Sequence, residues 1–192
     1  MTKGWPRFRI SEVCSEIIDC INKTAPTVDG PTPYKMIRTT NVRSGWVNHN
    51  NVKYVTEKIF KKWARRGRPH IGDVILTREA PLGEVGLLRS PDRIFLGQRL
   101  VMYRADKSKL DNRFLLYSFL ENDLQGQIKS LGSGATVEHM RVPDCENLII
   151  SLSWRRWPRP STESGSSISY ILGTRMCGWR NPSLGRSLRG GK

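Results

Sequence analysis

The segment DNRFLLYSFLENDLQGQIKSL, residues 111–131, constrains the fold more than any other part of the chain. Its apolar residues recur at the spacing that places them on one face of an α-helix. They are Phe114, Leu115, Phe119, Leu120, Leu124 and Ile128. Asp111 stands where an N-cap residue is expected, because its carboxylate accepts hydrogen bonds from the free N–H groups of a first helical turn. The pattern predicts one long amphipathic helix that packs its apolar stripe against the rest of the domain.

The segments before this helix are mostly strand-like. GDVILTREA (72–80), GEVGLL (83–88), RIFLGQRLVMYRA (93–105) and YKMIRTTNV (34–42) combine β-formers with turn residues, and VNHNNVKYV (47–55) resumes after the turn RSGW. EKIFKKWARRG predicts a short charged helix that ends at Gly67. Near the N-terminus, Ile10, Val13, Ile17 and Ile18 fit one helical face, and strand pairing of the first residues there is the alternative. These elements predict an α+β class: a small mixed, strand-rich domain with one long amphipathic helix.

Charge divides the chain into a domain, residues 1–150, and a tail, residues 151–192. The tail carries eight basic residues and one acidic residue, is rich in Ser, Arg and Gly, and has no periodicity, so it is predicted to be disordered. The domain carries 24 basic and 16 acidic residues and is therefore basic without the tail. A net charge of +15 favours a polyanionic partner, most often nucleic acid, over the alternative of a merely well-solvated basic surface.

Several other classes of protein are disfavoured. The sequence has no apolar run of membrane-spanning length and no secretion signal, which predicts a cytoplasmic protein. Its four cysteines form no C-x-x-C pair and its three histidines do not cluster with them, so no metal site is expected. The glycine loop SLGSGATVEH (130–139) follows a helix and lacks the lysine of a phosphate-binding loop. Without nuclease, methyltransferase or triad motifs, the sequence favours a binding protein with no catalytic residues and no cofactor.

Three motifs in order carry a resemblance to a known family. GDVILTREAPLGEVG, LGQRLVMYR and LGSGATVEHMRVPD, together with KMIRTTNVRSGWVN, resemble a target recognition domain of the type I restriction–modification specificity subunits. The resemblance covers most of residues 5–150. It implies a non-catalytic protein that reads one half of a split double-stranded DNA target. It also implies methyltransferase (modification) and endonuclease (restriction) subunits as partners.

The chain differs from that family in two ways. Full subunits carry two recognition domains, and this sequence holds one. After ENLII the family continues with a Pro-Pro-Leu-x-Glu-Gln segment that opens a long helix, whereas this chain reads SLSWRRWPRPSTESG. Our hypothesis for this change is a one-base frame shift near Ser151, and a genuine basic tail is the alternative. In either case the helix through which the family docks its partner subunits is not expected in this sequence.

Candidate DNA contacts follow from side-chain chemistry, because arginine suits guanine, asparagine and glutamine suit adenine, and cations suit phosphate. Candidate base readers are Arg38, Thr39, Asn41, Arg43, Asn48, Arg78, Gln98 and Arg99. For Gln98 and Arg99 a buried hydrogen-bonding network is an equal alternative. Candidate contacts to the DNA backbone are Lys61, Lys62, Arg65, Arg66 and Arg68, for which a solvated helix face is the alternative. Ser133 and Thr136 are candidate phosphate contacts, and packing against a neighbouring element is their alternative.

The sequence is also compatible with two other functions. One is a stand-alone basic protein that binds nucleic acid without sequence preference. The other is a recognition domain broken from a fused restriction–methylation enzyme. Binding at raised salt separates the first of these from a specificity subunit, because nonspecific binding weakens steeply with salt.

Overall fold

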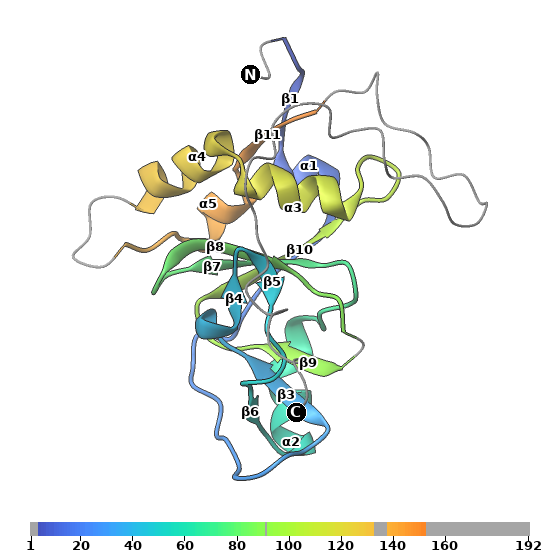
Figure 1. The fold of residues 1–192 in the computed structure, drawn as a ribbon, viewed down its shortest axis with the longest axis vertical. Helices are drawn as coiled ribbons and strands as arrows, with labels where there is room; N and C mark the ends of the chain where they lie inside the picture. Colours follow the sequence, from blue (N-terminus) through green and yellow to red (C-terminus); the bar gives the residue numbers. More distant parts are fainter. Residues whose placement is uncertain (1–3, 91, 133–137, 153–192) are drawn as a thin grey trace, which may run out of the picture. The chain divides into compact units, whose positions relative to one another are not determined.

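The computed structural model describes residues 4–90, 92–132 and 138–152 (Figure 1). The chain divides into two compact units, residues 1–157 and 158–192, and all described residues belong to the first. The predicted basic tail beyond Leu152, and the predicted phosphate contacts Ser133 and Thr136, lie outside the described residues.

A six-stranded mixed sheet forms the centre of the first unit. Its strands are β2 (Cys14–Asp19), β4 (Val42–Arg43), β5 (Gly45–Val47), β7 (Val74–Arg78), β8 (Leu82–Leu87) and β10 (Leu100–Ala105), in the order β2-β10-β7-β8-β5-β4. Only the β5–β8 pair among them is parallel. The strands predicted from GDVILTREA, GEVGLL and RIFLGQRLVMYRA are all present, which confirms that part of the sequence interpretation.

A second sheet of three strands carries the charged helix. Its strands are β3 (Tyr34–Ile37), β6 (Lys53–Tyr54) and β9 (Arg93–Leu96), with β3 antiparallel to β6 and parallel to β9. Helix α2 (Glu57–Trp63) continues into a 3-10 turn (Ala64–Arg66) and ends at Gly67, as predicted. Its Phe60 ring packs on this sheet, with centroids 5.0 Å from Tyr34 and 6.1 Å from Phe95.

Alternation along the strands explains how these layers stack. In β7, Val74 and Leu76 join the core cluster beneath the other helices, whereas Ile75 joins a second cluster on the opposite face. In β3, Ile37 contributes to that second cluster, and its neighbour Met36 packs with α2. The order of layers is therefore helices, six-stranded sheet, three-stranded sheet and α2 (Figure 1).

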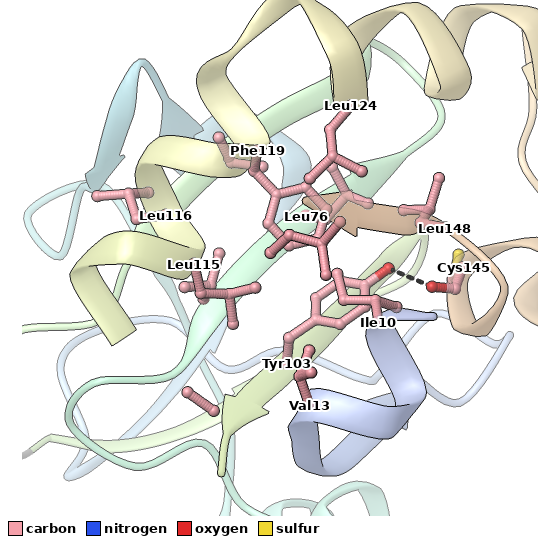
Figure 2. Packing of buried hydrophobic residues seen from close by; sticks show 14 of the residues in the cluster. Ile10, Val13, Leu76, Tyr103, Leu115, Leu116, Phe119, Leu124, Cys145 and Leu148 are labelled. Atoms are coloured by element: carbon pink, nitrogen blue, oxygen red, sulfur yellow. Dashed lines mark hydrogen bonds between the residues drawn. The ribbon is translucent and has the colours of Figure 1, made fainter. Parts of the chain in front are cut away.

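The helical layer consists of α1 (Ile10–Val13), α3 (Asn112–Leu120), α4 (Asn122–Gly132) and α5 (Val142–Glu146), next to a two-stranded ribbon of β1 (Arg7–Arg9) and β11 (Ile149–Ser151). Figure 2 shows its centre, where the buried Tyr103 ring lies 4.8 Å from the Phe119 ring. The Tyr103 hydroxyl donates a hydrogen bond of 3.1 Å to the Cys145 carbonyl oxygen, so the one polar atom of this ring is satisfied inside the core.

The prediction of one long helix over residues 111–131 was wrong, because the chain breaks at Glu121 and forms α3 and α4. Glu121 is extended, with ψ 153°. The break leaves the Phe119 carbonyl without an intrahelical partner, and the Gln125 side chain donates to it over 2.7 Å. Asn122 and Asp123 follow directly, and both types are better at helix starts than in helix interiors. The N-cap is confirmed, since the Asp111 side chain accepts from the Arg113 N–H.

The break also changes which apolar residues are buried. Leu115, Phe119, Leu124 and Ile128 are in the core as predicted, but Leu120 is 41% exposed. Leu116, which the predicted stripe omitted, is 3% exposed and takes part in the core in its place.

The single helical face predicted near the N-terminus was also wrong beyond Val13. Only Ile10–Val13 is helical, and Cys14–Asp19 forms β2, which pairs antiparallel with β10. Ile17 and Ile18 consequently point to opposite faces, one packed on the cluster beneath the helices and the other on the cluster between the two sheets.

Candidate nucleic-acid interface

Positive charge is concentrated around the three-stranded sheet. Residues 20–72 and 89–99, which include that sheet and α2, contain 14 basic and three acidic residues. Residues 106–152, which include α3, α4 and α5, contain five basic and seven acidic residues. A polyanion is therefore attracted to the end of the domain that carries the three-stranded sheet, and not to the helical layer.

Parallel pairing brings two predicted readers to one edge of that sheet. β3 and β9 run side by side with Ile37 opposite Leu96, and the Gly97 N–H donates to the Ile37 carbonyl over 2.7 Å. Arg38 and Gln98 therefore emerge at the same strand ends although they are far apart in sequence. The Gln98 side-chain oxygen, Oε1, accepts a hydrogen bond of 3.1 Å from the Thr24 hydroxyl, and within the described residues Nε of Arg38 is buried without a partner.

Asn41 is at this edge but is not available to a ligand. It ends a 3-10 turn (Thr39–Asn41) and is 3% exposed. Its Oδ1 accepts from the Arg38 N–H, and its Nδ2 donates to the carbonyl oxygens of Asn48 and Asn51. The interpretation of Asn41 as a base reader is therefore corrected: the side chain holds the backbone of the next loop. Asn48 itself is exposed, and its Oδ1 accepts from the Asn50 N–H.

Arg43 and Thr39 lie beside this loop. The Arg43 guanidinium donates to the carbonyl oxygens of Thr39 and Val42, and the residue is otherwise exposed. Arg43 is the register partner of Trp46 in the β4–β5 pair, and Trp46 is 63% exposed with the Arg89 guanidinium 4.1 Å from its ring centroid. Sequence reasoning treated this tryptophan only as part of a turn.

Arg78 and Arg99 belong to a different junction. Arg78 is 5% exposed and donates to the Met140 carbonyl over 2.9 Å, so the interpretation of Arg78 as a base reader is corrected to a core contact. Arg99 has a φ of 68° and its guanidinium lies 3.2 Å from the Glu79 carboxylate, whose other oxygen is 3.3 Å from Nδ1 of His139. Arg99 thus takes part in an ion-pair network, but 48% of its side chain is exposed, so it is not part of a buried network and its role as a base reader stays a prediction.

The basic run on and after α2 is largely exposed, and part of it is held by the protein. Arg66 forms an ion pair of 2.6 Å with Asp19, and Lys61 forms one of 2.8 Å with Glu57. The same Glu57–Lys61 contact lowers the pKa of Glu57 and raises the pKa of Lys61. The Arg68 carbonyl is fixed by Arg104, which also makes two hydrogen bonds to the buried Asp73 carboxylate.

In the basic run on and after α2, Lys62 and Arg65 have charges that remain available to a ligand. Lys62 lies 5.4 Å from the centroid of the Trp63 ring, and Arg65 is exposed. Cations in this arrangement suit the phosphates of a polyanion, which require charge without a fixed base pattern.

Two further properties bear on the kind of site. Among residues 4–90, 92–132 and 138–152, no group of three or more His, Cys, Asp and Glu side chains is arranged to hold a metal ion. In the same described part of the chain, no helix has both the length and the apolar character needed to cross a membrane.

Two exposed residues near Asn48 were missed by sequence reasoning, namely Asn50 and Asn51. The signal was present in the run NHNN, which places three asparagines within four residues.

Comparisons with known proteins find similarity to type I restriction specificity subunits. In sequence, 80 residues, or 42% of this chain, are 29% identical to the "Putative type I restriction enzyme MjaX specificity subunit" of Methanocaldococcus jannaschii. In structure, the HsdS subunit of Thermoanaerobacter tengcongensis matches 78% of this chain with a TM-score of 0.52 and 19% identity. A chain from a structure of the type I R-M system, described in terms of complex assembly and conformational transition, matches 80% with a TM-score of 0.58 and 19% identity. No protein-family model matches the chain.

These findings agree with the resemblance seen in the sequence, and the mixed strand-rich fold is the one found in the solved specificity subunit. The chain covers only part of these relatives: 18% of the length of the archaeal protein and 38% and 39% of the two solved chains.

Proposed function

We propose that residues 4–152 are a target recognition domain of a type I restriction–modification specificity subunit. In this role the domain binds double-stranded DNA, reads one half of a split target and directs methylation and cleavage by partner subunits. The domain itself is not an enzyme and works in the cytoplasm. Its partners are DNA and, in an assembled complex, the methyltransferase and endonuclease subunits.

The observation that carries this proposal is the edge formed by the ends of β3 and β9. Arg38, Gln98 and the loop that contains Asn48 meet there, within the segments 20–72 and 89–99 that together hold 14 basic and three acidic residues. Arginine and amide side chains supply the hydrogen bonds that distinguish base pairs in the major groove. The surrounding cations supply the phosphate contacts that set orientation. The similarity in sequence and fold to specificity subunits points to the same role.

The main competing function is nucleic-acid binding without sequence preference, which the net charge of +15 also supports. The two differ in what the protein selects. We expect the purified full chain to enrich a defined sequence from random duplex DNA, and to keep that preference when salt is raised from about 50 to about 200 mM, since only the phosphate contribution is salt-dependent. A scrambled duplex of the same length and composition is the control. Equal retention of unrelated duplexes at both salt concentrations would reject sequence recognition and favour the competing function.

A further inference from the structure

The loop Asn48, His49, Asn50 and Asn51, here called the asparagine loop, is fixed from below by Asn41. The buried Nδ2 of Asn41 donates to the Asn48 carbonyl over 3.1 Å and to the Asn51 carbonyl over 2.7 Å. In return the Asn48 N–H donates to the Asn41 carbonyl over 2.7 Å. Three hydrogen bonds to one buried residue thus set the conformation of both ends of the loop.

The centre of the loop is fixed as well. His49 turns inward, with 18% of its side chain exposed; its Nδ1 lies 3.6 Å from the Asp92 carboxylate, and neither ring nitrogen makes a hydrogen bond within the described part of the chain. That carboxylate forms an ion pair of 2.7 Å with Lys35 of β3. The loop is therefore held to the 3-10 turn by hydrogen bonds at its ends, and its middle is anchored by the burial of the His49 ring. A loop held in this way loses little conformational entropy when a ligand binds it.

The outward side of the loop consists of side-chain amides. Asn48, Asn50 and Asn51 are exposed, and Oδ1 of Asn48 is used by the Asn50 N–H over 2.8 Å. Within the described part of the chain, the side-chain amides of Asn50 and Asn51 take part in no hydrogen bond. Each therefore presents one acceptor and one NH₂ donor group to a ligand.

We propose that the asparagine loop is a base-reading element in which Asn50 and Asn51 recognise adenine, with Asn41 as the residue that positions them. An asparagine amide matches adenine N7 and N6 in the major groove with two hydrogen bonds, and no other base presents that pair of groups. Asn41 acts only through the loop, because all of its polar side-chain atoms are used inside the protein. The inference rests on the proposed function, and it assigns a base and a loop to the recognition that the function requires.

The first test repeats the selection from random duplex DNA with full-chain Asn50→Ala and Asn51→Ala. We expect one or both variants to lose the preference for an A·T pair at one position by about 5- to 150-fold, the range of a single bidentate contact, while the other positions stay unchanged. Asn122→Ala is the matched control, because Asn122 is also exposed but lies in the helical layer, at the start of α4. This control is expected to select the wild-type sequence.

The second test concerns Asn41→Asp, which keeps the acceptor for the Arg38 N–H and removes both donors to the loop. We expect the same A·T preference to weaken while the remaining positions and the salt dependence of binding persist. The urea midpoint of each variant shows that the protein is folded. A loss of preference at every position would indicate general damage and would reject the positioning role.

The outcomes distinguish a failure of adenine recognition by the asparagine loop from a failure of the proposed function. If the wild type selects no sequence, both are rejected. If the wild type selects a sequence and both alanine variants select it with the same A·T preference, the asparagine loop does not read adenine, and the proposed function stands.

Discussion

Because the predicted long helix is split into α3 and α4, two leucines five residues apart, Leu115 and Leu120, should contribute very different amounts to the free energy of unfolding. Leu115 is fully buried beneath α3 and Leu120 is 41% exposed (Figure 2 shows Leu115 in the core). Truncation of a buried leucine to alanine costs about 2–5 kcal/mol, because apolar packing is removed and a cavity remains. At Leu120 the surface is already partly hydrated and no closed cavity forms, so Leu120→Ala is expected to cost about 1 kcal/mol.

Urea unfolding followed by circular dichroism measures the difference. With an m-value of about 1–3 kcal/mol per molar urea, a loss of about 3 kcal/mol lowers the midpoint by about 1–3 M. We therefore expect a large shift for Leu115→Ala and a shift several-fold smaller for Leu120→Ala. Equal shifts for the two variants, or a larger one for Leu120→Ala, would mean that the helix is continuous and that its stripe is buried as the periodicity alone predicts.

Three further predictions address charge, thiols and pH. Arg65→Ala should weaken binding to all duplex sequences alike and flatten the slope of log affinity against log salt by about 1, whereas Lys107→Ala, in the acidic helical part, should leave both unchanged. Burial raises the pKa of Cys14 and of Cys145 to about 12, so at pH 8 both should react slowly with a thiol reagent in the native protein and rapidly in urea, as counted per cysteine by mass spectrometry. Burial lowers the pKa of His49 in the folded state, so below about pH 6.5 the unfolded state binds more protons at this residue and stability falls; His49→Gln should reduce the drop in urea midpoint between pH 7.5 and pH 5.5.

The strands were the predictable part of this fold, and the reason is visible in β7 and β10. Their residues alternate between two buried faces, Gly72 lies just before β7, and Gly97 directly follows β9 and separates it from β10. Helix ends were less predictable. At the break at Glu121 the Gln125 side chain donates a hydrogen bond to the Phe119 carbonyl, and the spacing of apolar residues in the sequence does not reveal such a contact. The sequence likewise suggested a helix where β2 forms, because the choice between helix and strand there depends on pairing with β10, which is distant in the sequence.

For the candidate interface, the sequence predicted residue types better than it predicted exposure. Asn41 and Asn48 look alike in the sequence, but one is buried and the other is exposed. Arg78 was placed after a strand that in fact includes it, and its side chain is consequently enclosed. The meeting of Arg38 with Gln98 depends on the parallel pairing of β3 and β9, which local patterns do not reveal.

Deletion of the tail tests whether it contributes to stability, and the folded core shows where the deletion should begin. β1 pairs with β11, the Leu152 N–H donates to the Pro6 carbonyl over 2.9 Å, and Leu152 is 4% exposed, so the core extends two residues past the predicted boundary at 150. Residues 153–192 carry eight basic residues and one acidic residue. If they add charge but no core, their deletion should leave the urea midpoint nearly unchanged.

The same deletion should change DNA binding in a specific way. Affinity for unrelated duplexes should fall, and the salt slope should flatten by about 0.9 for each phosphate that the shortened protein no longer neutralises. The sequence selected from random DNA should persist or sharpen, because the base-reading residues proposed above all lie within residues 38–99. Deletion of 34 residues, 159–192, which keeps residues 153–158, tests whether an effect arises at the junction. A cooperative loss of folding in both deletions would show that the tail is structural and would exclude an out-of-frame origin for it.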